Sequence, residues 1–339
     1  MDRLRAQAAA RLRRALALAL PLGLALPPAA ALPAPAARDF EHRPEVRTFV
    51  AEMRDRHGFP EADLRRAFRE ARFQPSVIRA IMPPRDPGIR SWQAYRARFV
   101  EPGRVVMGQR FRRENAAALA GAAARYGVPE EVIVAIIGVE TIFGRHTGGY
   151  RTFDALATLA FGYPPRAELF RRELEELLLL AREEGRDPRG YKGSYAGALG
   201  LPQFLPSSRR RHAVDFDEDG RIDLAASPAD AIGSVARFLA DHGWRSGEPV
   251  LVPATANGDR VAELLALGIE PRLRPAEMAD YGVAAPDAPD LPATLVDYVT
   301  PAAGTEYRLG FRNFYVLTRY NRSSFYATAV FDLAEALKQ

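Results

Sequence analysis

The feature that most constrains this fold is a long apolar run, VIVAIIGVETIF at residues 132–143, interrupted by a single acid, Glu140. The run is rich in β-branched residues, which also suit a buried strand. Its flanks favour a helix: Pro129 suits a first turn, the two glutamates after it suit the positive end of a helix dipole, and Gly144 suits a C-terminal cap. About fifteen residues between these signals is long for a strand and ordinary for a helix. The sequence therefore predicts a helix that is apolar nearly all round, with Glu140 in its last turn.

A carboxyl group in that position has a raised pKa, because burial removes hydration from the charged form and the C-terminal end of the helix dipole repels it. An acid that keeps its proton near neutral pH can donate it to a leaving oxygen. The alternative is a structural glutamate that pairs with a neighbouring cation such as Arg145. The spacing alone leaves both interpretations of Glu140 open.

Residues 1–37 have the layout of a secretory signal peptide, with an Arg-rich start, an apolar stretch at 15–26, and then small residues and prolines. The apolar stretch is too short and too interrupted by proline for a good membrane span. We therefore expect cleavage near Arg38, no integral membrane segment in the mature protein, and a periplasmic location. An uncleaved membrane anchor is the alternative.

The predicted signal segment also accounts for most of the positive charge. It holds five arginines and one aspartate, a charge of +4, whereas the whole chain carries +5, so about +1 remains. A nearly neutral mature chain gives no reason to expect a nucleic-acid partner. The chain has no cysteine, which excludes disulfides, thiolate catalysis and a lipoprotein anchor on an N-terminal cysteine.

The rest of the chain changes character along its length. Up to about residue 246, apolar residues recur at helical spacing. Residues 247–312 contain short β-branched and aromatic stretches separated by turn formers, which predict strands, and helical spacing then returns. We therefore predict a mainly α, α+β protein. Its expected regions are a helical subdomain at 38–112, a helical core at 113–246, a small β-containing subdomain at 247–312, and a segment at 313–339 that packs back on the helical body.

A candidate binding element is the segment GSYAGALGLPQFLPSS at 193–208. Its glycines let backbone approach a ligand, and Ser194 and Gln203 offer hydrogen bonds to hydroxyls and amides. No GK[ST] follows, so this is not a phosphate loop. A glycine-rich turn between two helices is the alternative. Four tyrosines could also present flat faces to sugar rings, although each one singly is ordinary packing. They are Tyr150, Tyr163, Tyr195 and Tyr320.

The segment DFDEDGRIDL at 215–224 matches the first eight positions of an EF-hand calcium loop. The twelfth position, normally a glutamate, is Ala226. The candidate ligands are three alternating carboxylates, one backbone carbonyl and one later carboxylate: Asp215, Asp217, Asp219, Arg221 and Asp230. Asp230 also fits the first turn of a helix that Ser227 would cap. We favour a structural calcium site, in which Asp230 is the ligand that the spacing supports least.

Several segments, in order, resemble the lytic murein transglycosylase B family, whose members cleave peptidoglycan glycan strands. GVETIFGRHTGGY with DALATLAF resembles the catalytic segment of that family. Further similar segments are YPPRAELF, GSYAGALGLPQFLPSS, AVDFDEDGRIDL, DAIGSVARFLADHGW and the pair Tyr320-Asn321. The resemblance runs from about residue 40 to the end of the chain. It implies a lysozyme-like helical catalytic core with flanking subdomains.

The resemblance also implies roles for particular residues. Glu140 matches the single catalytic acid of the family. Ser194 and Gln203 match residues that line the saccharide groove beside that acid. Tyr320 and Asn321 match a pair near the reaction subsite, where the amide can contact the substrate N-acetyl group.

One position departs from the family pattern. Arg166 matches one of two adjacent arginines, but Pro165 stands in place of the first. This departure puts in doubt part of a contact to the peptide stem or the lactyl carboxylate, though not the bond cleavage.

The reaction that the resemblance implies needs only one protein acid. Most glycosidases use two carboxylates, and no second one is obvious beside Glu140 in the sequence. Assistance by the N-acetyl group of the substrate removes that need. Glu140 would protonate the oxygen between N-acetylmuramic acid and N-acetylglucosamine, and then accept the C6 hydroxyl proton to leave a 1,6-anhydromuramic acid end. A lysozyme-type hydrolase and a non-catalytic peptidoglycan-binding protein are the alternatives.

Peptidoglycan glycan strands are therefore the expected partner. We expect calcium to be the only cofactor, with no organic group, and we expect the protein to act as a monomer.

Overall fold

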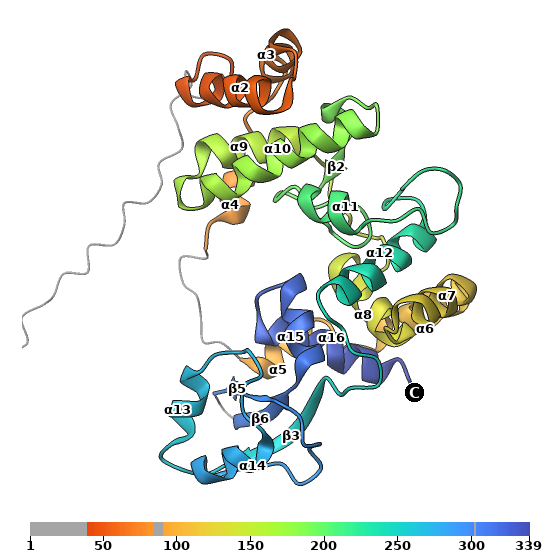
Figure 1. Ribbon diagram of the computed structural model, residues 1–339, viewed down its shortest axis with the longest axis vertical. Coiled ribbons are helices and arrows are strands. Elements are labelled where there is room, and N and C mark those ends of the chain that lie inside the picture. Colours follow the sequence, from red (N-terminus) through yellow and green to blue (C-terminus); the bar gives the residue numbers. More distant parts are fainter. Residues whose placement is uncertain (1–38, 84–90, 302) are drawn as a thin grey trace, which may run out of the picture. The chain divides into compact units, whose positions relative to one another are not determined.

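The computed structural model of the chain describes residues 39–83, 91–301 and 303–339, so the predicted signal segment 1–37 lies outside the described residues. Helices dominate, and the strands are short (Figure 1). The predicted mainly α, α+β class is confirmed. Within the described ranges, every helix is too short or too polar to cross a membrane. The boundaries of the regions predicted along the chain stay predictions.

The N-terminal helices share one hydrophobic core with two later helices. These elements are α2 (Pro44–His57), α3 (Glu61–Arg69), α4 (Pro75–Ile81), α9 (Thr152–Gly162) and α10 (Ala167–Glu183), with the 3-10 helices η2 (Pro164–Arg166) and η3 (Pro188–Gly190). Phe49, Phe68 and Phe161 meet edge to face, with ring centroids 5.9 to 6.0 Å apart. Aromatic pairs favour this geometry, so the three rings join α2, α3 and α9 firmly.

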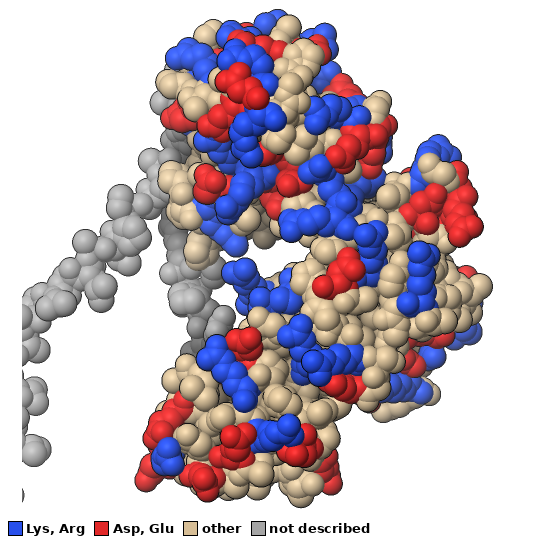
Figure 2. Space-filling model, in the orientation of Figure 1, with Lys and Arg blue, Asp and Glu red and all other residues tan. Residues whose placement is uncertain are grey.

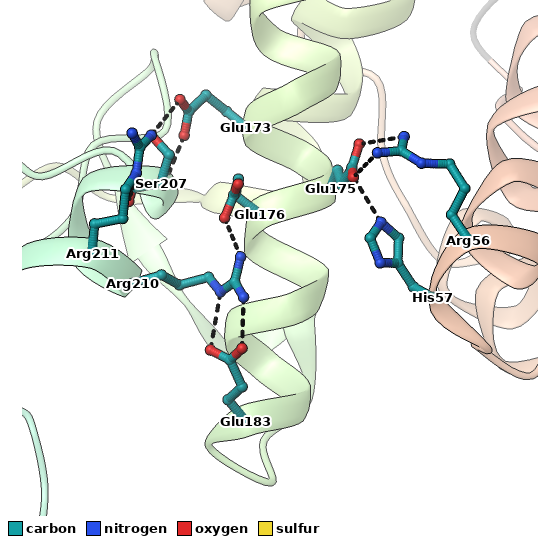
Figure 3. Close-up of polar contacts among 9 residues, drawn as sticks. All are labelled: Arg56, His57, Glu173, Glu175, Glu176, Glu183, Ser207, Arg210 and Arg211. Atoms are coloured by element: carbon teal, nitrogen blue, oxygen red, sulfur yellow. Dashed lines mark hydrogen bonds and ion pairs between the residues drawn. The ribbon is translucent and has the colours of Figure 1, made fainter.

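Charged residues on α10 pair with α2 inside this core, through Glu175 and His57, and with the segment that follows residue 205 outside it (Figure 3). Glu173 is buried and accepts hydrogen bonds from the backbone N–H of Ser207 at 3.0 Å and from its hydroxyl at 2.7 Å. Glu183 pairs with Arg210 at 2.6 Å. Ser207 and Arg210 both belong to α11 (Pro206–His212). Because Glu173 satisfies an N–H in the first turn of α11, it holds that helix, and the segment before it, against α10.

A second core surrounds α8 (Glu130–Thr141). Its other helices are α5 (Trp92–Arg96), α6 (Pro102–Glu114), α7 (Ala116–Tyr126), α12 (Pro228–Asp241), α15 (Arg312–Tyr320) and α16 (Ser324–Ala336). Helices α6, α7, α12 and α16 all contact α8, and residues 132–139 are buried. A helix that is apolar nearly all round is stable only when other helices cover it, and α8 is covered in this way.

The end of α8 differs in detail from the prediction. Pro129 is the N-cap rather than part of the first turn, and the helix ends at Thr141. Ile142, Phe143 and Gly144 then all adopt left-handed backbone conformations, with φ of 51°, 56° and 87°. Two non-glycine residues in this region cost energy, so surrounding contacts must hold them there. The chain therefore turns sharply immediately after Glu140.

The strands predicted after residue 247 form an antiparallel sheet of order β4-β3-β6-β5. They are β3 (Leu251–Ala256), β4 (Val283–Ala284), β5 (Thr294–Thr300) and β6 (Gly304–Gly310), with α13 (Val261–Ala266), α14 (Pro275–Met278) and η4 (Ala279–Tyr281) between them. Leu264, Leu295 and Phe311 belong to a small separate core of this region. Elsewhere, β1 (Tyr150–Arg151) pairs with β2 (Lys192–Gly193), which brings the chain after α8 beside the segment that begins at residue 193.

Candidate active site

Glu140 lies in the last turn of α8 and is partly exposed, unlike the eight buried residues before it. The hydroxyl of Tyr326 on α16 donates a hydrogen bond to Glu140 Oε1 at 2.6 Å. Burial raises the pKa of Glu140 to about 7, while the bond from Tyr326 acts in the opposite direction. Glu140 therefore holds its proton over a range in which an ordinary glutamate is ionised.

Two further tyrosines lie close enough to Glu140 to interact with its charge. The rings of Tyr320 and Tyr326 are stacked, with centroids 6.4 Å apart, and Tyr95 on α5 completes the group. Burial, and secondly the carboxylate of Glu140, raise the pKa of all three hydroxyls, so they stay neutral. The sequence reasoning missed Tyr326 and Tyr95. The sequence does contain one signal for Tyr326: it is a tyrosine among the apolar residues of the last helix, and a buried tyrosine hydroxyl needs a hydrogen-bond partner.

Arg145 does not pair with Glu140. Within the described ranges the carboxylate makes its hydrogen bond to a neutral tyrosine, and Arg145 is exposed and forms no ion pair. The interpretation of Glu140 as a structural glutamate neutralised by this arginine is therefore not what the geometry shows.

A cavity of about 480 Å³ lies beside the turn that follows α8. Its lining includes Ser194, Gln203 and Tyr195 from the glycine-rich segment, together with Tyr150, Arg145 and His146. The structure thus brings three of the predicted substrate-binding residues together in one cavity. The pairing of β1 with β2 explains why, since it joins the two stretches of chain that form the walls.

The polar groups in this cavity keep hydrogen-bonding capacity for a ligand. Ser194 Oγ accepts bonds from the backbone N–H groups of Ala196 at 3.3 Å and Ala198 at 3.1 Å, so its own proton is available to donate. Gln203 Nε2 donates to the carbonyls of Thr147 at 3.2 Å and Gly200 at 2.9 Å, which uses both amide protons and leaves Oε1 as an acceptor.

The Tyr320-Asn321 pair lies at the end of α15. Tyr320 donates a hydrogen bond from its hydroxyl to the carbonyl of Pro202 at 2.6 Å, which connects α15 with the glycine-rich segment. Asn321 is exposed, as a residue that contacts substrate must be.

Two other predicted binding residues lie elsewhere. Tyr163 is buried in the core of the N-terminal helices, and Arg166 is exposed with its guanidinium 6.0 Å from the ring centre of Phe170. Neither one lines the cavity beside Ser194 and Gln203.

The acidic loop, defined here as residues 215–223, gathers carboxylates between α11 and α12. Carboxylate oxygens of Asp215, Asp217 and Asp230 all lie within 4.8 Å of one another. Asp219, also predicted as a ligand, is exposed, and its carboxylate is not part of this group. Arg221, which was predicted to offer its backbone carbonyl, is exposed, and its role stays a prediction. Three converging hard oxygen donors suit calcium, so the residues fit the predicted ion.

Asp230 lies both in the carboxylate cluster and in the first turn of α12. Its carboxylate accepts hydrogen bonds from the backbone N–H groups of Phe216 at 2.7 Å and Asp223 at 2.6 Å, which hold both ends of the acidic loop. Its own N–H donates to Ser227 Oγ at 3.2 Å, so Ser227 does cap α12. The same hydroxyl donates to Asp217 at 2.6 Å. The helix cap and the carboxylate cluster are therefore parts of one arrangement.

Outside this loop the charges are mixed. Figure 2 shows Lys and Arg interspersed with Asp and Glu over the visible face.

Comparison with known proteins identifies the family. Residues 41–335 match the family model described as a transglycosylase SLT domain. The chain belongs to this family. It is also 42% identical, over 88% of its length and 84% of the relative's length, to membrane-bound lytic murein transglycosylase B of Escherichia coli (strain K12). The resemblance noted in the sequence is thus confirmed.

Solved structures of the same kind share the fold. The catenated lytic transglycosylase SltB1 from Pseudomonas aeruginosa is 46% identical, with a TM-score of 0.83 over 88% of this chain and 99% of that one. The Escherichia coli lytic transglycosylase Slt35 in complex with calcium is 41% identical, with a TM-score of 0.79 over 88% of this chain and 94% of that one.

Proposed function

We propose that Glu140 is the catalytic acid and base of this lytic transglycosylase, which cleaves the β-1,4 bond between N-acetylmuramic acid and N-acetylglucosamine in peptidoglycan. The supporting observation is its setting: a partly exposed carboxyl at the end of an apolar helix, with a pKa of about 7 and a single tyrosine partner. A group with a pKa near the working pH can both give and take a proton.

The reaction can proceed with this one carboxyl group. Glu140 transfers its proton to the glycosidic oxygen as the C1–O bond of the muramic acid breaks, and the N-acetyl carbonyl oxygen of the same sugar bonds to C1. The Glu140 carboxylate then accepts the proton of the C6 hydroxyl, whose oxygen displaces the acetamido oxygen at C1. The product carries a 1,6-anhydro ring, Glu140 is protonated again, and no water is consumed.

The cavity beside the turn that follows α8 supports a saccharide-binding role for its polar lining. Ser194 offers a donor and Gln203 an acceptor, which suit sugar hydroxyls and N-acetyl groups, and the exposed Tyr195 offers a ring face. We place Tyr320 and Asn321 at the reaction subsite. The Tyr320 hydroxyl contacts the carbonyl of Pro202, so the pair lies against the glycine-rich segment. Arg166, which is exposed, would contact only parts of the polymer that extend beyond this cavity, whereas the buried ring of Tyr163 is not available to it.

We propose that the acidic loop and the first turn of α12 together bind calcium, through Asp215 and Asp217 of the loop and Asp230 of the helix. Carboxylates that repel one another in the ion-free loop are stabilised by a divalent cation. The ion would have a structural role, because it brings together the loop and the first turn of α12 through Asp230. The relative Slt35 has been solved in complex with calcium.

We also propose that the protein is exported to the periplasm by its first 37 residues and acts there as a monomer on glycan strands. N-terminal sequencing of the mature protein tests this: a start near Arg38 agrees with it, and an intact Met1 in a membrane fraction contradicts it.

Analysis of digests of purified sacculi by mass spectrometry tests the reaction itself. The expected products end in 1,6-anhydromuramic acid and are each lighter by one water than hydrolytic products. Reducing muramic acid ends would show a lysozyme-type hydrolase, and binding without release of fragments would show a non-catalytic protein.

A further inference from the structure

The residue directly after Glu140 carries a fully buried hydroxyl with an unusual set of partners. Thr141 Oγ1 lies 3.0 Å from the carbonyl oxygen of Leu201 and 3.2 Å from that of Ile137, and it accepts a hydrogen bond from the N–H of Gly144 at 3.0 Å. A hydroxyl has one proton to donate, and a buried threonine in a helix commonly gives it to the carbonyl four residues earlier. Here the shorter contact goes to Leu201, which lies sixty positions later in the chain.

Leu201 is held from its other side as well. Its N–H donates to the carbonyl of Leu224, the residue directly after the acidic loop, at 2.7 Å. Gly200, just before it, has φ of +67°, and a Cβ at that position would lie 2.3 Å from the same carbonyl oxygen, so only glycine permits this close approach. Leu201 therefore lies between Leu224, just after the acidic loop, and Thr141, at the end of α8. Its N–H is hydrogen-bonded to the first residue and its carbonyl to the second.

The same short segment carries the ligand-binding amide. Gln203 follows two residues later with φ of 51°, a strained conformation for a non-glycine residue. Its amide binds back to Gly200, and the carbonyl of Pro202 accepts the hydroxyl of Tyr320. The contact from Thr141 is thus a direct hydrogen bond between the segment around Gln203 and the helix turn that bears Glu140.

We propose that Thr141 is a positioning residue, whose hydroxyl holds the last turn of α8 at a set distance from the Gly200–Gln203 segment and so aligns Glu140 with the saccharide bound beside Gln203. The proposal rests on the proposed function of Glu140. It also gives the left-handed turn after Glu140 a structural role. The turn brings the Gly144 N–H to the Thr141 hydroxyl, which also contacts the Leu201 carbonyl.

Replacing Thr141 by Val keeps the shape and removes the hydroxyl. The N–H of Gly144 and the buried carbonyl of Leu201 then lose this partner, and the turn and the segment can move apart. A misplacement of about 1 Å in a catalytic group can cost about 10²-fold in rate, so we expect Thr141→Val to lower kcat by at least about tenfold with little change in KM. Thr141→Ser, which keeps the hydroxyl, should stay within about threefold of wild type.

The pH profile distinguishes positioning from simple loss of stability. The titratable groups that face Glu140 are Tyr95, Tyr320 and Tyr326, which stay neutral near pH 7. When the end of α8 loosens, water reaches Glu140, and the loss of its burial lowers its pKa. The alkaline limb of the activity profile should therefore move to lower pH in Thr141→Val and keep its place in Thr141→Ser.

The experiment measures initial rates of fragment release from purified sacculi for the two variants and wild type, at several pH values and well below each melting temperature. If valine prevents folding, Thr141→Ala is measured with the same expectation. A variant that melts lower but keeps the kcat and pH profile of wild type would overturn the proposal. Glu140→Gln is measured alongside: if it is inactive while Thr141→Val is normal, only this inference fails, and if it is active, the proposed function fails.

Discussion

Glu140 at the end of α8 lies among tyrosine hydroxyls and apolar side chains, whereas the carboxylates of Asp215, Asp217 and Asp230 lie beside one another, two of them open to water. The chemical group is the same in both places. A lone carboxyl with little hydration keeps its proton, while a group of adjacent carboxylates attracts a cation. The comparison shows that surroundings, and not residue type, decide whether a carboxyl group suits proton transfer, as we propose for Glu140, or metal binding, as we propose for the acidic loop.

The largest effect should come from removing the transferable proton. Glu140→Gln keeps the shape and a hydrogen bond with Tyr326, so we expect a loss of at least about 10² to 10⁴ in rate, the range typical of general acid catalysis. Binding to sacculi should survive, because Ser194 and Gln203 are untouched. Fragment release and pull-down on the same sacculi measure both. Glu114→Gln, at an exposed position on α6, is the matched control and should behave as wild type.

Calcium should act on stability and not on chemistry. An ion that binds only the folded protein stabilises it by about 2.7 kcal/mol when its concentration is 100 times the dissociation constant. We expect the melting temperature of wild type to rise with calcium and fall with chelator, while most activity remains at low temperature.

Variants of the acidic loop test whether its carboxylates cause the response of the melting temperature to calcium. The double variant Asp215→Asn with Asp217→Asn should lose the response to calcium, and Glu218→Gln, outside the carboxylate cluster, should keep it. An unchanged melting temperature of wild type in millimolar calcium would mean that the acidic loop is only a turn joined to a helix cap.

A smaller effect is expected from Tyr326→Phe. The hydrogen bond from Tyr326 lowers the pKa of Glu140, so its loss should raise that pKa above about 7. Because activity needs the protonated acid, the alkaline limb of the rate profile should move to higher pH, opposite to the shift expected for Thr141→Val. Tyr315→Phe, on α15, should leave the limb in place. A limb that does not move in Tyr326→Phe would show that this bond does not set the pKa of Glu140.

The smallest effect concerns stability. The pKa of Glu140 rises from an ordinary 4.5 in the unfolded chain to about 7 in the folded protein. Folding therefore gains stability from the protonated group below pH 4.5, and loses it as the pH rises through about 7. The melting temperature of Glu140→Gln should match that of wild type at pH 4 and exceed it by pH 8. A constant difference at all pH values would contradict the raised pKa.

Much of this protein could be predicted from short stretches of sequence. Pro129, the glutamates after it and the apolar run predict α8, and the spacing of Asp215 and Asp217 predicts two members of the carboxylate cluster. These features depend on residues a few positions apart, whose geometry is dictated by helix periodicity and turn chemistry. Glu140 could be predicted near the end of α8 for the same reason, because its position depends only on the local helical pattern.

The tertiary structure alone decided which distant groups meet. Tyr326 reaches Glu140 across 186 positions because α16 packs on α8, and Thr141 reaches Leu201 because the glycine-rich segment folds against the end of that helix. The same packing leaves Tyr163 and Arg166 outside the cavity that holds Ser194. Local spacing carries no information about such contacts, since they depend on how whole helices cover one another's apolar surfaces. The sequence thus indicates an acid within an apolar helix, and the packing of the helices decides how deeply that acid is buried and which groups surround it.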